Sequence, residues 1–506
     1  MADTLSRCMD DAFSRFEGKI AITFMRNDNL ETELTYGRLK RDIDCLAATL
    51  STHGLKKGER VILFLQKSII ALVAHLALQK LGLICVPLNP GFKEDELRYL
   101  INDADPGLIL ADPNSCDDLQ KLAPRCQVIP VDTGKPYQSL DLFTSDVKCP
   151  EIIVGPNDPG LIIYTSGTTG DPKGAILTHK NLVHDAANII AIWQINQNDI
   201  LCHALPLFHV HGLCFALHTT LLAGAGIIML DRFDPARVIE MLAQKDGNRS
   251  CTVFMAVPVM YTTMLDALEK QPRDYSHLRL ITSGSAPLLP KEFERIETLF
   301  GQKPVEREGM TETGMNFSNP IDGRRRPGSV GLPLPGLLVR IVDAETFKDV
   351  TPGDIGEIWL KSAAITPGYF RKPVETGEAF EEGWFRTGDL GRCDDQGYYY
   401  ITDRIKHIII TGGENVSAKE VETVIGRIQG IAEVAVVGIP DEKWGETVVA
   451  AVVPKPGSKI RADDIKAFCK KHLHDWKCPK QVQFVAEIPK NTMGKVLKEV
   501  LKNRLA

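Results

Sequence analysis

The glycine- and hydroxyl-rich segment YTSGTTGDPKG, residues 164–174, has the residue types of a phosphate-binding loop. It directly follows an apolar run at residues 160–163 that is typical of a buried strand. Backbone N–H groups and side-chain hydroxyls can converge on phosphate oxygens there, while a lysine supplies positive charge. The spacing from Gly167 through Gly170 to Lys173 does not fit the Walker A pattern, so a different kind of phosphate loop is predicted. The candidate phosphate ligands are Thr165, Ser166, Gly167, Thr168, Thr169, Gly170 and Lys173.

This loop resembles the signature loop of the adenylate-forming superfamily, which includes acyl-CoA synthetases, peptide-synthetase adenylation domains and firefly luciferase. The resemblance covers nearly the whole chain, because further family motifs follow in the expected order up to Lys495. It implies an AMP-forming enzyme that activates a carboxylic acid as an acyl-adenylate and passes the acyl group to coenzyme A. The cofactors and co-substrates it implies are ATP, Mg²⁺ and coenzyme A, with a small-molecule carboxylic acid as the other partner.

A second segment, REGMTET at residues 307–313, resembles the family's second nucleotide motif. The resemblance assigns Thr311 to the α-phosphate and Glu312 to Mg²⁺, an ion usually bound through one or two carboxylates and phosphate oxygens. Read alone, these residues could instead cap the start of a helix. The family generally stacks an aromatic residue on adenine where this chain has Glu308. Since base stacking contributes roughly 1–3 kcal/mol, we expect ATP to bind about tenfold to a hundredfold more weakly here.

Two further segments resemble the family's ribose and hinge motifs. Asp389, in WFRTGD at residues 384–389, is implied to accept hydrogen bonds from both ribose hydroxyls, which suits an acceptor-only carboxylate. The resemblance also implies that Arg404 contacts the nucleotide and that Lys406 is the hinge about which a C-terminal domain rotates. Without the resemblance, Arg404 and Lys406 would be interpreted as a solvated linker.

The last motifs concern catalysis and coenzyme A. Lys495 matches the family's catalytic lysine, whose ammonium group bridges the substrate carboxylate and the α-phosphate and so offsets the repulsion between two anions. Gly412 and Gly413 resemble the loop that faces the pantetheine tunnel, where glycine allows the backbone to approach a thin chain closely. The candidate catalytic residues are Lys495, Thr311 and His209.

The pocket for the acid is expected to combine several separate segments. His209 and His211 fall in a motif that the resemblance implies to gate the acid tunnel; no further ligand cluster accompanies them, so a metal site is not indicated. A packed, hydrogen-bonded His209 is the structural alternative. The pocket candidates are His209, Val257, Thr263, Ser283, Gly284, Ser285 and Met315.

The identity of the acid depends on Thr263. Several strings, such as residues 205–213 and 283–289, look especially like malonyl-CoA synthetases, in which a basic side chain after a Val-Pro-x-x-Tyr segment pairs with the distal carboxylate. Here Thr263 occupies that position, and an unpaired second carboxylate would cost on the order of several kcal/mol to desolvate. A fatty or short-chain monocarboxylic acid is therefore at least as consistent as malonate. Two further functions stay open: a stand-alone adenylation enzyme that loads a carrier protein and, because of Glu308, an inactive nucleotide-binding relative.

The elements that must position these residues follow an α/β rhythm. Near-continuous apolar strands alternate with helices, which is typical of layered folds with largely parallel sheets. The predicted helices of this region cover residues 71–81, 94–102 and 235–244, and the predicted strands cover residues 84–88, 108–110, 227–230 and 253–256.

From about Gly328 the chain is punctuated by glycine and proline, which predicts a small β-rich subdomain with strands at residues 339–342 and 357–360. A compact pattern follows, with helices at residues 419–428 and 462–472 and strands at residues 434–437 and 448–453. We therefore predict an α/β fold with three parts. These are an N-terminal adenylation domain at residues 1–402 with the acid, ATP and Mg²⁺ sites, a hinge at 403–406, and a small mobile α+β domain at 407–506 that carries the catalytic lysine.

Composition excludes several classes of protein. With 44% hydrophobic and 25% charged residues the 506-residue chain is globular, and its net charge of −6 without a long basic run argues against nucleic acid as a partner. The 12 cysteines form no Cys-x-x-Cys pair, so neither a zinc site nor a disulfide framework is indicated, and a reducing compartment is expected. No apolar run approaches the ~20 residues that span a bilayer, and the first residues do not resemble a leader peptide. We expect a cytoplasmic protein; nothing in the sequence indicates its oligomeric state.

Overall fold

The computed structural model describes residues 4–140, 148–165, 171–245, 247–411, 414–441, 444–492 and 494–505. The chain divides into two compact units, which are described separately. The first unit comprises Met1–Leu338 and Lys361–Phe385, and the second comprises Val339–Leu360 and Arg386–Ala506. The hinge at residues 403–406 stays a prediction.

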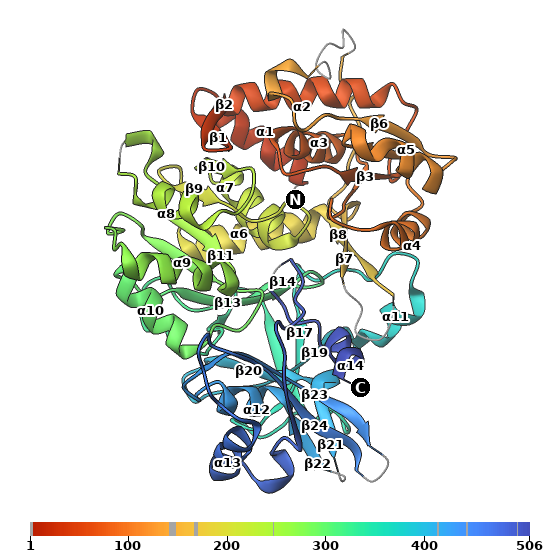
Figure 1. The fold of residues 1–506 in the computed structure, drawn as a ribbon. Coiled ribbons are helices and arrows are strands. Elements are labelled where there is room, and N and C mark those ends of the chain that lie inside the picture. The colour runs from red at the N-terminus through yellow and green to blue at the C-terminus, as the bar shows by residue number, and fades with distance from the viewer. Residues whose placement is uncertain are drawn as a thin grey trace. The chain divides into compact units, whose positions relative to one another are not determined.

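The first unit contains a six-stranded sheet whose neighbouring strands are parallel except for the final pair, a hairpin (Figure 1). Three of its strands, β5 (Leu108–Ala111), β3 (Arg60–Phe64) and β4 (Ile84–Pro87), are nearly all apolar and buried, as expected for strands covered on both faces. In spatial order the strands are β6 (Gln127–Pro130), β5 (Leu108–Ala111), β3 (Arg60–Phe64), β4 (Ile84–Pro87), β7 (Pro159–Thr165) and β8 (Lys173–Thr178).

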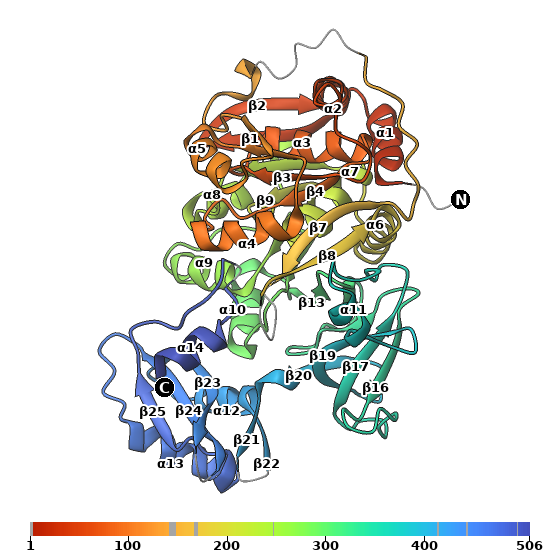
Figure 2. The same cartoon turned by 90° about the vertical axis from the view of Figure 1, so that its right-hand side faces the viewer.

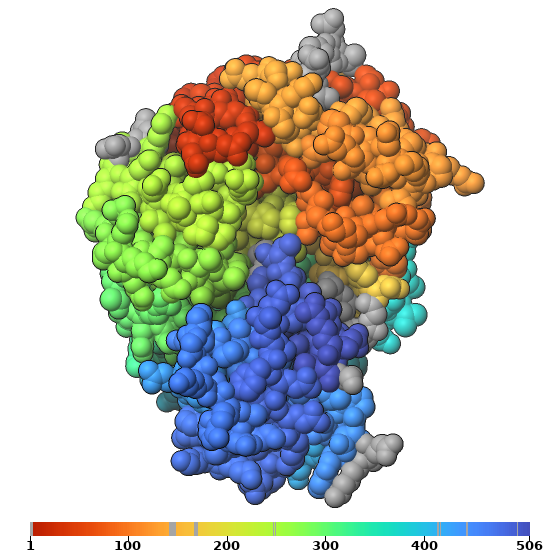
Figure 3. Space-filling view, viewed as in Figure 1, coloured from red at the N-terminus to blue at the C-terminus, as the bar shows by residue number. Residues whose placement is uncertain are grey.

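A nine-stranded sheet forms the rest of the first unit's framework. Its six central strands are parallel, and antiparallel strands complete both edges. In the space-filling view the red N-terminal surface accordingly lies beside the yellow-green surface of residues that follow β9 (Figure 3). In spatial order the strands are β15 (Leu332–Pro333), β14 (Gly314–Ser318), β13 (Val305–Met310), β12 (Leu280–Ser283), β11 (Val253–Ala256), β9 (Ile200–His203), β10 (Gly226–Leu230), β1 (Ile20–Arg26) and β2 (Asn29–Thr35).

Helices cover these sheets, and α6 packs beside the β7–β8 hairpin (Figure 2). A π-helix, η3 (His211–His218), interrupts the α-helical pattern and continues into α7. The α-helices of this unit are α1 (Leu5–Arg15), α2 (Tyr36–Ser51), α3 (Ile69–Lys80), α4 (Glu94–Ala104), α5 (Pro113–Leu122), α6 (His179–Trp193), α7 (Thr219–Leu222), α8 (Pro235–Ala243), α9 (Pro258–Lys270), α10 (Pro290–Phe300) and α11 (Pro373–Glu378).

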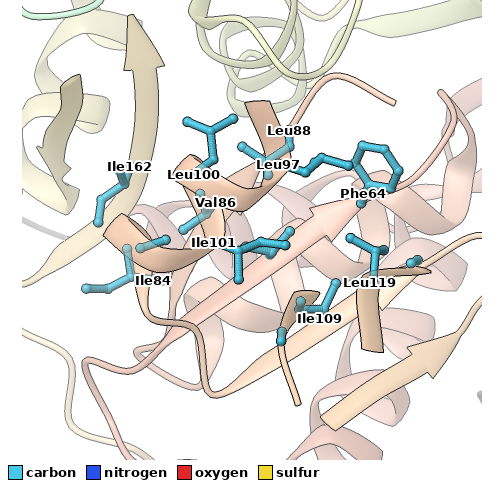
Figure 4. Close-up of a cluster of buried hydrophobic side chains, with 14 residues drawn as sticks. Phe64, Ile84, Val86, Leu88, Leu97, Leu100, Ile101, Ile109, Leu119 and Ile162 are labelled. Atoms are coloured by element: carbon cyan, nitrogen blue, oxygen red, sulfur yellow. The ribbon is translucent and has the colours of Figure 1, made fainter. Parts of the chain in front are cut away.

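The core under α4 and α5 shows why these strands form. Alternate side chains of β3, such as Ile62 and Phe64, point to one face of the sheet. They pack there against Leu100 and Ile101 of α4 and Leu119 of α5 (Figure 4). Each fully buried side chain of this kind stabilises the fold by about 1.5–3 kcal/mol relative to an exposed one. This packing holds the six-stranded sheet that carries the predicted phosphate loop.

The second unit has two smaller sheets. One contains β16 (Leu338–Val342), β17 (Gly356–Lys361), β19 (Trp384–Cys393) and β20 (Tyr399–Arg404); the short β18 (Phe380–Glu381) pairs with the first residues of β19. The other contains β21 (Ile408–Thr411), β22 (Glu414–Ser417), β23 (Ile431–Asp441), β24 (Gly445–Pro454) and β25 (Gln481–Phe484). Its helices are α12 (Ala418–Ile425), α13 (Ala462–His472) and α14 (Lys498–Leu505).

The α/β fold class predicted from the sequence is thus confirmed. Every helix and strand range named above in the sequence overlaps an observed element of the same type. Among the residues that the structure describes, no helix has both the length and the apolar character needed to cross a membrane. All 12 cysteines are free thiols.

Candidate active site

The predicted phosphate loop connects the two strands of the β7–β8 hairpin. Thr165 ends β7 and pairs with Lys173, the first residue of β8, and the Thr165 hydroxyl donates to the Lys173 carbonyl at 3.4 Å. The hairpin therefore fixes both ends of the loop. Ser166, Gly167, Thr168, Thr169 and Gly170 lie outside the described residues.

The predicted magnesium ligand lies at the turn of a second hairpin, formed by β13 and β14. Thr311 and Glu312 occupy this turn, and the helix start that the isolated sequence also allowed is absent there. Glu312 is buried, whereas Thr311 is half-buried. Gly314 closes the turn with a φ of 73°, a conformation that favours glycine.

The two hairpins meet at one side chain, that of Tyr369. Its hydroxyl donates to Oε1 of Glu312 at 3.1 Å, while Nζ of Lys173 lies 5.4 Å from the centre of its ring. A lysine at this distance gains a cation–π attraction of about 0.5–1 kcal/mol. The predicted phosphate-binding lysine and the predicted magnesium carboxylate thus share a neighbour, although 139 residues separate them.

Tyr369 is itself held by backbone pairing. The N–H of Phe370 donates to the carbonyl of Gly174 at 2.8 Å, and the N–H of Ile176 donates to the carbonyl of Gly368 at 3.1 Å. This pairing aligns the Tyr369 segment with β8. Sequence reasoning missed Tyr369, and the aromatic pair that follows Gly368 was the only signal available.

Two of the predicted acid-pocket segments also come together. Nδ1 of His211, at the start of η3, lies 3.2 Å from the hydroxyl of Ser285. Gly212 permits this packing, because a Cβ there would lie 2.0 Å from the carbonyl oxygen of Pro206. Burial lowers the pKa of His211 well below its usual value, and the nearby Arg307 charge lowers it further. His211 is therefore neutral at physiological pH.

A buried arginine next to this pair was missed in the sequence. Arg307 is 3% exposed, its guanidinium carbon lies 5.2 Å from the ring centre of Phe215, and it crosses the face of Gly284. Nε, Nη1 and Nη2 have no hydrogen-bonding partner in the part of the chain that the structure describes. Burial lowers the pKa of Arg307 to about 10, and the charges of Glu308 and Asp185 act in the opposite direction. Arg307 therefore remains a cation at neutral pH.

The remaining pocket candidates lie on several elements. Val257 is buried before α9, and Ser283 is buried at the end of β12. Met315 is buried in β14, where its N–H donates to Oδ1 of Asp185 at 2.8 Å. His209 is half-buried, and burial lowers its pKa to about 4. Thr263 lies exposed on α9, where its hydroxyl donates a hydrogen bond to the carbonyl of Val259 in the same helix.

Asp185 and Glu308 lie beside this group but have other partners. Burial raises the pKa of Asp185 to about 7, and its hydrogen bond from Met315 acts against that shift. Glu308, in the place of the family's aromatic residue, accepts from Nδ2 of Asn316 at 3.1 Å. The carboxylate of Glu308 is thus oriented by β14.

In the second unit, the predicted ribose ligand and its arginine are paired. Asp389 on β19 faces Arg404 on β20 in the antiparallel register. Nε of Arg404 lies 2.6 Å from Oδ1 of Asp389, off the hydrogen-bonding direction, and Nη2 donates to Oδ2 at 3.4 Å. The ion pair presents a buried carboxylate and a half-buried guanidinium together.

Lys406 and Lys495, the predicted lysines of the second unit, both act electrostatically on His407. Burial lowers the pKa of Lys406 to about 8, and the neighbouring Arg404 lowers it further. Burial also lowers the pKa of His407 to about 3, with the charges of Lys406, Arg404 and Lys495 among the further causes. The N–H of Lys495 donates to the side chain of Asn491 at 2.9 Å. Gly412 and Gly413 lie outside the described residues.

The site's chemistry suits a nucleotide with its metal ion. Within the described ranges no group of three or more His, Cys, Asp or Glu side chains could hold a metal ion. A single buried carboxylate such as Glu312 fits Mg²⁺, because phosphate oxygens and water supply the remaining ligands of this hard cation. Tyr369 leaves Glu312 with further oxygen lone pairs for such a bond.

Comparisons with known proteins agree with this arrangement. The model of the AMP-binding enzyme family matches residues 9–370, and that of the AMP-binding enzyme C-terminal domain matches residues 420–495. The mitochondrial malonate–CoA ligase of Mus musculus is 36% identical, over 93% of this chain and 87% of its own. The long-chain-fatty-acid–CoA ligase of Bacillus subtilis is 32% identical, over 98% of this chain and 94% of its own.

A solved structure extends the likeness to three dimensions. The crystal structure of ATP-bound MatB from Rhodopseudomonas palustris superposes with a TM-score of 0.91 at 37% identity. The match covers 99% of this chain and 98% of that one. The chain belongs to the family of AMP-binding enzymes.

Proposed function

We propose that the chain is an AMP-forming acid:CoA ligase, an enzyme that uses ATP, Mg²⁺ and coenzyme A. The observation that carries this proposal is the meeting of Lys173 and Glu312 at Tyr369. A cation and an acidic metal ligand around one tyrosine suit the phosphates of a Mg²⁺-bound nucleotide. Relatives of the family that cover most of the chain are named CoA ligases.

The reaction has two half-reactions. A carboxylate oxygen of the acid attacks the α-phosphorus of ATP, and the bond to pyrophosphate breaks to leave an acyl-adenylate. The sulfur of coenzyme A, having lost its proton to solvent, then attacks the acyl carbon and releases AMP. Mg²⁺ supplies charge neutralisation at the phosphates.

We assign the residues of this chain as follows. Lys173 and Thr311 bind phosphate oxygens, and Glu312 holds the metal ion. Asp389 binds the ribose. Lys495 offsets the repulsion between the acid and the α-phosphate, since a cation in a partly desolvated site stabilises gathered negative charge.

The acid is a separate question, because the relatives differ in it. One is named for malonate, which carries a second carboxylate, and the other for long-chain fatty acids, which do not. The scattered free cysteines support a reducing compartment, and a cytoplasmic location is part of this proposal.

The test is incubation of the purified chain with ATP, Mg²⁺, coenzyme A and a panel of acids, followed by mass spectrometry. Acyl-CoA, AMP and pyrophosphate in equal amounts are expected. AMP without acyl-CoA would overturn coenzyme A as acceptor and favour a carrier protein. ATP binding with no acid-dependent pyrophosphate would instead identify an inactive relative.

A matched pair of variants assigns Lys495. Lys495→Ala should suppress adenylation far more than thioester formation from supplied acyl-adenylate. The control is Lys455→Ala, a lysine that follows β24 in the same unit. Equal loss in both half-reactions would contradict the assignment of Lys495.

A further inference from the structure

The guanidinium group of Arg307 is a buried cation in the first unit. All three of its nitrogens are buried and have no hydrogen-bonding partner among the described residues. A buried cation normally has a carboxylate or several acceptors around it, because its desolvation is otherwise uncompensated. Within the described part of the chain the guanidinium of Arg307 therefore lacks the hydrogen-bond acceptors that would compensate its desolvation.

The two carboxylates nearest in charge do not fill this role. Asp185 accepts the N–H of Met315 at 2.8 Å, and Glu308 accepts from the side chain of Asn316 at 3.1 Å. Both act on Arg307 only through space. Neither carboxylate accepts a hydrogen bond from the guanidinium group of Arg307, although such a group can donate to two carboxylate oxygens at once.

Other buried polar atoms without partners lie on the segments beside Arg307. Nε2 of His211 and the hydroxyl of Ser283 are both buried and also lack a partner within the described ranges. Arg307 acts on His211 electrostatically, both side chains contact the ring of Phe215, and Ser283 adjoins Gly284, which Arg307 crosses. The Ser283 hydroxyl can donate, as can Nε2 of His211 in the tautomer that carries its proton there, and these atoms surround one permanent cation, which suits an anionic ligand.

Arg307 is close in the chain to Thr311, which is proposed to bind the phosphate that the acid attacks. Arg307 lies on β13 four residues before Thr311, so their Cα atoms are about 13 Å apart for a strand rise of ~3.3 Å per residue. A ligand that links the two sites therefore spans no more than about 13 Å, which favours a short acid over a long-chain one.

We propose that Arg307 binds a second anionic group of the acid substrate, so that the enzyme selects short acids with two acidic groups. The proposal rests on the proposed ligase function and names its substrate class. The distal carboxylate or sulfonate would pair with the guanidinium fork, with His211 and Ser283 as further donors.

This role does not involve Thr263. That residue is exposed on α9 and its hydroxyl is bonded within its own helix. A charge on β13 replaces the basic side chain that the sequence lacks at Thr263. A monocarboxylic acid would leave the Arg307 charge buried and unpaired, and this cost provides the selectivity.

The experiment measures kcat/KM for AMP release with malonate, succinate and sulfoacetate, each compared with propionate and butyrate. Wild type should prefer the dianionic acids. Arg307→Met should lower kcat/KM for them by at least about 100-fold, mainly through the KM of the acid, while the monocarboxylic acids lose little. Arg307→Lys, which keeps the charge but loses the fork, should be intermediate. Arg98→Met, at an exposed pair on α4, is the control.

The outcomes separate the possible causes. Equal loss for every acid, or a raised KM for ATP instead of the acid, would overturn the proposal and assign Arg307 to structure or to the nucleotide phosphates. Wild type that turns over propionate and butyrate as well as the dianionic acids would also overturn it, with the ligase function intact. If no acid releases AMP, the proposed function itself fails.

A second measurement uses only the wild-type protein, so its result does not depend on whether the Arg307 variants fold. Malonate should raise the melting temperature of the wild-type protein, and propionate at the same concentration and ionic strength should not. Equal shifts with the two acids would contradict a site for the second anionic group.

Discussion

The hydroxyl of Tyr369 donates a 3.1 Å hydrogen bond to the carboxylate of Glu312. The same ring lies against the ammonium group of Lys173. Tyr369 therefore orients the proposed metal ligand and keeps it beside the lysine of the phosphate loop. Partners of this kind fix the direction of a ligating carboxylate.

Removing the Tyr369 hydroxyl should weaken the metal site without removing a ligand. Tyr369→Phe keeps the ring next to Lys173 but frees Glu312 to rotate. The Mg²⁺ concentration for half-maximal ATP–pyrophosphate exchange should rise about tenfold, whereas Glu312→Gln should cost more because a ligand charge is lost. The control is Tyr275→Phe, a buried tyrosine whose hydroxyl has no partner in the described chain. An unchanged Mg²⁺ dependence in Tyr369→Phe would contradict this role.

The Asp389–Arg404 pair should determine how tightly the enzyme binds the ribose of ATP. Asp389→Asn keeps the shape but loses the charge that both Arg404 and a diol would use. The KM for ATP should rise about 10–100-fold, as expected for hydrogen bonds to a charged group. Wild type should also discriminate against 2′-deoxy-ATP, and the variant should discriminate less.

The control for this pair is Asp349→Asn, whose partner Arg340 lies 2.8 Å away in the same unit. It should leave the KM for ATP unchanged. The same discrimination against 2′-deoxy-ATP in wild type and Asp389→Asn would assign the pair to stability alone.

Local sequence predicted the residues whose chemistry is local. Lys173 stands in a short run whose residue types and order indicate phosphate binding, whereas the metal role of Glu312 was implied by the family resemblance. Tyr369 and Arg307 carry no such signal, because their roles depend on partners far away in the sequence. The exposure of Thr263 could not be predicted from the sequence either, because it depends on how α9 packs.

The fold was more predictable than the site, because apolar runs determine which segments are buried. The predicted and observed ends of some elements differ. The helix predicted at residues 419–428 ends at Ile425, where Gly426 follows. The strand predicted at residues 434–437 extends over Ile431–Asp441, because β24 pairs along its whole length. Cross-strand pairing of this extent is not visible in a single segment.

Gly284 should be intolerant of a side chain because of Arg307. A Cβ at this position would lie 2.5 Å from Nε of Arg307, so the guanidinium or β12 must shift. Gly284→Ala should lower the free energy of unfolding by about 1–3 kcal/mol, measured by urea denaturation. Gly377→Ala is the control, since a Cβ there meets no atom within 4 Å and should be neutral or slightly stabilising. Equal stability of the two variants would show that Arg307 moves freely.

The buried pair His75 and His218 should make the first unit sensitive to acid. Their Nε2 atoms are 2.8 Å apart and their rings are stacked. Burial lowers the pKa of His75 to about 3, with a further contribution from His179, and lowers the pKa of His218 well below its usual value. Both are therefore neutral in the folded protein, although the unfolded chain protonates them below a pH of about 6.5.

The sign of the effect follows from proton binding. As the pH falls below about 6.5 the unfolded state binds protons that the folded pair does not, so folding loses about 1.4 kcal/mol per pH unit for each histidine. Burial raises the pKa of Asp185 to about 7 and that of Glu306 to about 8, and these groups act oppositely by stabilising the fold as the pH falls. A variant lacking only the pair isolates its share, because the two carboxyl groups are unchanged.

The double variant His75→Leu, His218→Leu should therefore lose less stability between pH 6.5 and 5.0 than wild type. The difference should approach about 2 kcal/mol per histidine, measured as the change in the free energy of unfolding in urea at each pH. His53→Leu, which removes a half-buried histidine that contacts Gln127, is the control for a general loss of titratable groups. If the double variant and wild type lose the same stability over this range, the pair takes up protons in the folded state. A stacked, neutral pair in the core would then be the wrong description of these two histidines.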